Sequence, residues 1–94
     1  MVIGLLTVEL QIPASQSLKN KRQVTRSLIS RLRQEFNISV AEVDHQDSWQ
    51  LCTLGIACVS GETSQVQQLM RRVATCIEEH AVDYYVLEVQ SELL

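Results

Sequence analysis

Hydrophobic residues alternate with other residues from position 2 to position 12, which is the two-residue period of a β-strand. One parity of this run is strongly apolar and contains Val2, Gly4, Leu6, Val8, Leu10 and Ile12. The other parity changes from apolar to polar along the run, and the alternation stops at Pro13. We therefore predict a first strand with one buried face and one partly exposed face.

A helical period replaces the alternation after Pro13. Ser15 and Ser17 offer side-chain oxygens that can cap a helix N-terminus. The apolar positions that follow fall within one arc at 3.6-residue spacing; they are Leu18, Val24, Leu28, Ile29, Leu32 and Phe36. We expect an amphipathic helix of five turns, closed by Asn37 because asparagine tolerates the left-handed cap conformation.

Two strands are predicted next, over residues 38–44 and 49–60, separated by the polar turn HQDS at 45–48. A link this short joins antiparallel neighbours. Helical spacing then indicates a second helix of about 17 residues that ends near His80. A final alternation over VDYYVLEVQSEL, residues 82–93, predicts a fourth strand.

The predicted order is β-α-β-β-α-β, and both helices are apolar on one face only. Such helices pack on one side of a sheet, and right-handed crossovers limit the possible topologies. We predict an α+β, ferredoxin-like fold with a four-stranded antiparallel sheet and two helices on one face. A chain of 94 residues is long enough for one core and too short for two, so residues 1–94 are expected to form a single domain.

Features of a secreted or membrane-bound chain are missing from this sequence. The apolar opening carries no basic segment, meets Glu9 early and lacks a small-residue cleavage site, so it is interpreted as a strand. No apolar stretch approaches the length of a membrane span. The odd cysteine count, Cys52, Cys58 and Cys76, has no CxxC pair and favours buried thiols in a reducing compartment. We expect a soluble, cytoplasmic protein without a membrane partner.

Charge is distributed unevenly along the chain. Residues 1–36 carry six basic and two acidic side chains, a balance of +4, whereas residues 37–94 carry two basic and nine acidic side chains, a balance of -7. The net charge of -3 therefore says little about partners.

The basic residues of the first helix form a stripe. At 100° per residue, Lys19, Arg22, Arg26 and Arg33 lie on one flank of the apolar arc, and Lys21 falls near the arc itself. The simplest interpretation is a solvated helix face, with Glu35 positioned to pair with Arg31. The functional hypothesis is a non-enzymatic binding module in which Lys19, Lys21, Arg22, Arg26 and Arg33 contact the phosphates of RNA or a ribosomal subunit. An acidic protein surface is the alternative partner.

The turn region EVDHQDSW, residues 42–49, raises a second functional hypothesis. Asp44, His45 and Asp47 are candidate ligands for a divalent metal in an enzyme or metal-dependent regulator. Their spacing matches no known metal loop, and Asp and Ser residues are typical of tight turns. We therefore expect a structural turn. The histidines stand in no triad-like order with a Ser or Cys, so the sequence predicts no catalytic residue and no cofactor.

The strings SLKNKR, RLRQEFNISVAEVDHQDSWQ and LGIACVS give the chain a specific resemblance to a known family. Over essentially its whole length, the chain resembles the small bacterial YlxP-like family of domains of unknown function. The resemblance implies a ferredoxin-like fold. Members are often encoded beside translation factors and ribosome-binding factor A, which implies a connection with ribosomal RNA or ribosome assembly. It implies no reaction and no catalytic residue.

The face of the sheet without helices suggests an oligomer. If the helices cover one face of the sheet, the other face exposes Ile3, Leu5, Tyr84 and Val86. Glu9 and Glu88 lie on the same face, and acidic residues there argue against the aromatic base-stacking surface used by RNP-type sheets. We expect a homodimer formed through the open sheet face or an edge strand.

Overall fold

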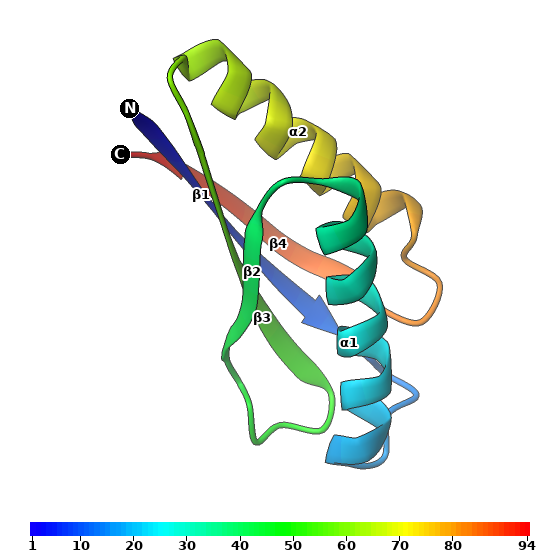
Figure 1. The fold of residues 1–94 in the computed structure, drawn as a ribbon. Coiled ribbons are helices and arrows are strands. Elements are labelled where there is room, and N and C mark those ends of the chain that lie inside the picture. The colour runs from blue at the N-terminus through cyan, green and yellow to red at the C-terminus, as the bar shows by residue number, and fades with distance from the viewer.

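The computed structural model describes residues 1–94 and confirms the predicted order of elements. The elements are β1 (Val2–Gln11), α1 (Leu18–Glu35), β2 (Ser39–Asp44), β3 (Leu51–Ser60), α2 (Thr63–Glu79) and β4 (Tyr85–Leu93). All strand pairs are antiparallel, and the sheet has the order β2-β3-β1-β4. Both helices lie on the same side of the sheet (Figure 1). The α+β, ferredoxin-like prediction is therefore confirmed.

Helix α1 begins as predicted and ends differently. The Ser17 side chain accepts a hydrogen bond from the Asn20 backbone N–H at 3.1 Å, which satisfies one free donor of the first turn. At the other end, Phe36 has an extended backbone with φ -133°, while its N–H still bonds to the Leu32 carbonyl. The predicted left-handed ending at Asn37 is wrong, because the chain leaves α1 in an extended conformation that leads directly into β2.

The core lies between the sheet and the two helices. The inward parity of β1 is almost fully buried, with Leu6, Val8, Leu10 and Ile12 all at most 2% exposed. Leu28 and Leu32 of α1 and Val73 and Ile77 of α2 belong to the same cluster. Each buried side chain of this size contributes roughly 1.5–3 kcal/mol relative to an exposed one. Helix α2 packs over β1, β3 and β4, whereas α1 packs mainly over β2.

A β-bulge in β4 changes which residues face the helices. Glu88 pairs with Glu9, but the next partner of β1, Leu10, pairs with Val86, so Leu87 is unpaired. Tyr84 is consequently buried on the helix side, where its hydroxyl donates to the Ile77 carbonyl. The prediction that Tyr84 and Val86 lie on the open face is wrong, because one extra residue reverses the alternation.

The open face of the sheet retains two of the predicted residues, Ile3 and Leu5, because they alternate with the buried Gly4 and Leu6 on β1. Glu9 and Glu88 are direct cross-strand partners on this face, as the sequence indicated. Neither helix is long and apolar enough to cross a membrane.

Candidate nucleic-acid interface

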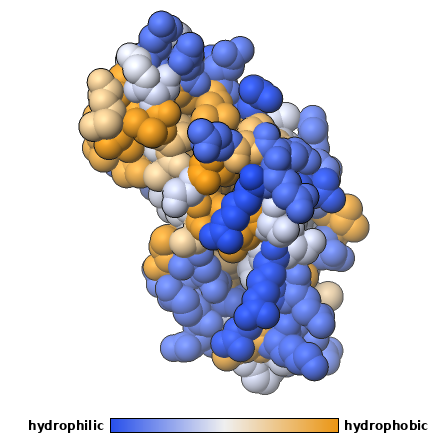
Figure 2. All heavy atoms as spheres, in the orientation of Figure 1, coloured by the Kyte–Doolittle hydropathy of each residue, from blue (hydrophilic) through white to orange (hydrophobic).

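The basic stripe predicted on α1 consists of four exposed side chains, Lys19, Arg22, Arg26 and Arg33. Arg33 donates a hydrogen bond from Nη2 to the Val40 carbonyl of β2 at 2.9 Å, so the stripe lies on the flank of α1 that faces the β2 edge of the sheet. The structure has two ion pairs, Lys21 with Glu42 and Arg31 with Glu35, and neither includes a stripe residue. Figure 2 shows the hydrophilic side chains that cover this part of the molecule. The four cations therefore form an exposed row without acidic partners.

Lys21 does not belong to this row. It is 1% exposed, and its Nζ donates to the carbonyls of His45 at 2.7 Å and Leu51 at 3.0 Å. The same Nζ lies 3.1 Å from Oε2 of Glu42. Grouping Lys21 with the surface cations was wrong, because its position on the helix falls inside the apolar arc and points it toward the sheet. Lys21 instead fastens the first turns of α1 to the β2–β3 turn.

Polar side chains of the β2–β3 turn are hydrogen-bonded to backbone groups of the same turn. His45 has φ 61°, and its N–H bonds to Oδ1 of Asp44 at 2.7 Å. The Ser48 hydroxyl accepts a hydrogen bond from the Leu51 N–H at 3.0 Å. The structure contains no group of three His, Cys, Asp or Glu side chains placed to hold a metal ion, so Asp44, His45 and Asp47 are not brought together as ligands. Backbone carbonyls of this turn, those of His45 and Gln46, accept hydrogen bonds from Lys21.

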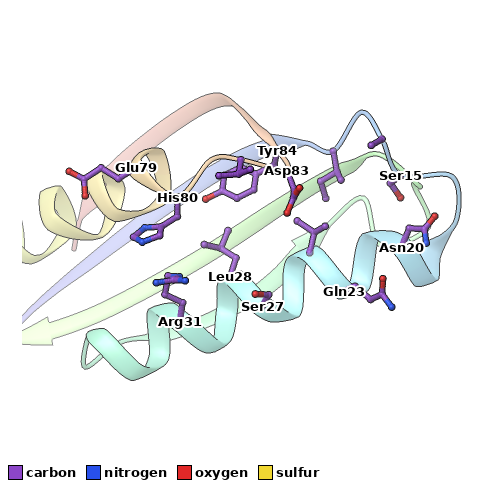
Figure 3. Close-up of a pocket in the computed structure, with 14 residues that line it drawn as sticks. Ser15, Asn20, Gln23, Ser27, Leu28, Arg31, Glu79, His80, Asp83 and Tyr84 are labelled. Carbon is purple, nitrogen blue, oxygen red and sulfur yellow. The ribbon is translucent and has the colours of Figure 1, made fainter.

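A polar groove lies on the opposite flank of α1, between this helix and the connection from α2 to β4 (Figure 3). Its volume is about 630 Å³. Asn20, Gln23, Ser27 and Arg31 line it from α1, and His80 and Asp83 line it from the other wall. Figure 3 shows Arg31 and His80 pointing toward each other across one end of the groove.

Sequence analysis missed this groove because its walls are far apart in the chain. The signal that was present is the run of small and polar side chains on one flank of α1, Asn20, Gln23 and Ser27, at helical spacing. These residues lie beside the apolar arc, on the flank of α1 away from the basic stripe, where Arg31 also lines the groove.

Three side chains near the end of this groove resemble a nucleophile with its base: the thiol of Cys76, the imidazole of His80 and the carboxylate of Glu35. The Cys76 thiol donates to Oε2 of Glu35 at 3.4 Å, and Nδ1 of His80 lies 2.8 Å from the Cys76 carbonyl. A carbonyl accepts only, so Nδ1 carries the proton and cannot take one from the thiol. Burial, followed by the hydrogen bond to Glu35, raises the pKa of Cys76 to about 11. The thiol is therefore protonated at neutral pH and is not an activated nucleophile.

Comparison with known proteins identifies relatives of this chain but no activity. The family described as "Protein of unknown function (DUF503)" matches residues 3–91. The chain is 36% identical over 77 residues to "Uncharacterized protein YlxP" of Bacillus subtilis (strain 168), an alignment that covers 82% of this chain and 84% of that protein. Among solved structures, "De novo designed protein Foldit4" is similar with a TM-score of 0.53 at 12% identity, over 98% of this chain and 96% of that one. At this identity the similarity shows the fold alone.

Proposed function

The chain belongs to the DUF503 family of proteins of unknown function, and we propose that it is a non-enzymatic binding module that docks on RNA, free or within a ribosomal particle, through α1. The contacts are made by Lys19, Arg22, Arg26 and Arg33. Lys21 supports this surface from inside by holding the N-terminal turns of α1 against the β2–β3 turn.

The observation that carries the proposal is the absence of an ion pair at all four stripe residues. At 1.5 Å per residue, the row from Lys19 to Arg33 extends over roughly 20 Å, which is long enough to follow several phosphates. Unpaired like charges repel one another, and this repulsion is relieved when a polyanion binds and its counterions are released. The row is therefore better suited to a phosphate backbone than to folding stability.

The mode of binding follows from the rest of the surface. The open sheet face places Glu9 directly opposite Glu88, so phosphates would be repelled there. Contacts from the side of a helix to phosphates position a protein without reading bases. We therefore expect affinity that depends strongly on salt and weakly on RNA sequence.

The test is co-sedimentation with ribosomal subunits, and with ribosomal RNA freed of protein, over a series of salt concentrations. The informative variant carries Arg22→Glu and Arg26→Glu. The matched control carries Arg71→Glu and Arg72→Glu, which makes the same charge change in α2. We expect the wild type and the control to bind at low salt and the α1 variant not to bind.

Two results would contradict the proposal. Equal loss of binding in both variants would mean that net charge matters and α1 does not. Binding to the subunits without any binding to ribosomal RNA freed of protein would assign α1 to an acidic protein partner.

A further inference from the structure

The two edge strands of the sheet are not equally protected. Strand β2 has six residues, a register shift between Glu42 and Asp44, and a carbonyl on Val40 that is occupied by Arg33. Strand β4 has nine residues, all exposed except Val86, and no side chain from another element is hydrogen-bonded to it. The bulge of β4 lies at Leu87, so the stretch from Glu88 to Leu93 keeps a regular register with β1. A regular exposed edge without proline or lysine is a template for pairing with another strand.

The backbone geometry of β4 shows which residues offer their hydrogen-bonding groups outward. Ile3 of β1 and Leu94 exchange both backbone hydrogen bonds. Because such pairs alternate along an antiparallel ladder, Glu92 and Gln90 also point their N–H and C=O groups toward β1. The outward groups therefore belong to the residues between them, Leu93, Ser91 and Val89.

We propose that β4 pairs antiparallel with β4 of a second copy of this chain, with the two-fold axis at Ser91. The two four-stranded sheets then form one continuous sheet. Ser91 faces Ser91 of the partner subunit, and Val89 faces Leu93 of the partner subunit. All three outward-pointing residues of each β4 are hydrogen-bonded in this arrangement.

Charge distinguishes this register from its neighbours. With the axis at Ser91, Gln90 lies opposite the partner's Glu92, and an amide can donate to that carboxylate. A shift that places the axis at Gln90 would set Glu88 directly opposite the partner's Glu92, and like charges in that position are destabilising. A shift in the other direction would place the axis at Glu92 and set the Glu92 side chains of the two chains directly opposite each other, which is destabilising for the same reason.

The side chains at the proposed seam are apolar and half-exposed. Val89 is 38% exposed and Leu93 is 39% exposed, and both lie on the helix side of β4. Val89 also lines a cleft of about 330 Å³ between α2 and β4, together with Leu6, Met70 and Ala74. Leu93 of the partner subunit would lie beside this cleft and remove apolar surface of both chains from water.

The dimer leaves the proposed RNA surface free. Strand β2, which lies beside the basic stripe, is at the opposite edge of the sheet from β4. A dimer would therefore carry two basic stripes at its two ends. Dimer formation does not depend on RNA binding, so the two proposals can fail separately.

The first test is sedimentation equilibrium of the purified protein. We expect a monomer–dimer equilibrium whose dissociation constant rises about tenfold in Ser91→Lys, because the variant sets two lysines opposite each other at the axis. Ser39→Lys, the same change on the β2 edge, should leave the constant unchanged. A wild type that stays monomeric at high concentration, or equal effects of both variants, would overturn the proposal.

The second test fixes the register with single cysteines. Residues directly opposite in a hydrogen-bonded pair have Cα atoms about 5.5 Å apart, within disulfide range. Mild oxidation should therefore cross-link Ser91→Cys into a covalent dimer and leave Gln90→Cys monomeric. The native cysteines are buried and provide a common background. Cross-linking of Gln90→Cys in preference to Ser91→Cys would contradict the proposed register.

Discussion

The two edges of this small sheet differ in how they are protected: side chains of α1 bind backbone groups at the β2 edge, whereas the β4 edge is open. At the β2 edge, two cations of α1 reach backbone carbonyls: Lys21 binds those of His45 and Leu51, and Arg33 binds that of Val40. At the β4 edge no helix cation is hydrogen-bonded to the strand, and Leu87, Val89 and Leu93 remain exposed. The difference teaches that the basic residues of α1 have two roles: Lys21 holds the helix on the sheet, Lys19, Arg22 and Arg26 remain free for a partner, and Arg33 binds the Val40 carbonyl while it stays exposed at the end of the stripe.

Removal of the buried lysine should have the largest effect on stability. Lys21→Met leaves the Glu42 carboxylate without its cation and two carbonyls without a donor, so we expect a loss of roughly 3–5 kcal/mol in the free energy of unfolding. Urea denaturation measures this value.

Two variants test the reason for that loss. Lys19→Met, two residues earlier on the exposed flank, should change the free energy of unfolding by less than about 0.5 kcal/mol. Adding Glu42→Leu to Lys21→Met should restore part of the stability, because no buried charge is then unpaired. If both lysine substitutions lowered the free energy of unfolding by a similarly small amount, Lys21 would not stabilise the β2 edge.

The second prediction concerns the interior beneath the β4 side of the sheet. A Cβ at Gly4 would clash with Cγ1 of Val66 and lie 2.8 Å from Sδ of Met70. Gly4→Ala should therefore cost roughly 1–3 kcal/mol through overpacking, measured by thermal or urea denaturation. Gly61→Ala is the matched control, because a Cβ there meets no atom within 4 Å and the glycine does not have a positive φ. Equal free energies of unfolding for Gly4→Ala and Gly61→Ala would contradict the close packing of α2 on β1 at Gly4.

The smallest stability effect is expected at the outer side of β2. Arg33→Ala removes one hydrogen bond to the Val40 carbonyl, so we expect a loss of about 1 kcal/mol. Arg31→Ala removes only an exposed ion pair with Glu35 and should cost less than about 0.5 kcal/mol. The reverse order in denaturation experiments would mean that Arg33 does not protect this edge.

The element order was accessible from sequence because periodicity reports local geometry. The apolar parity of β1 and the apolar arc of α1 each describe one face of one element, and both are found in the core. The helical period placed Lys21 near that arc, yet its burial depends on the carbonyls of His45 and Leu51, which periodicity does not locate.

The bulge in β4 could not be predicted from the alternation of apolar and polar residues in the sequence. Tyr84, Tyr85, Val86 and Leu87 are all apolar or aromatic, so either parity fits a buried face. The register is set by pairing with β1, where Leu10 takes Val86 as its partner and leaves Leu87 out. The polar groove was missed for a related reason, since His80 and Asp83 meet α1 only through tertiary packing.

The most direct test of the central claim, that the unpaired cations of α1 bind RNA phosphates, is the salt dependence of RNA affinity in single substitutions. Four phosphate contacts to single-stranded RNA predict a slope of roughly -3 for log K against log salt concentration. Arg26→Gln should make this slope shallower by about one, whereas Arg31→Gln, on the groove flank and paired with Glu35, should leave it unchanged. An unchanged slope in Arg26→Gln, or equal changes in the two variants, would contradict the claim.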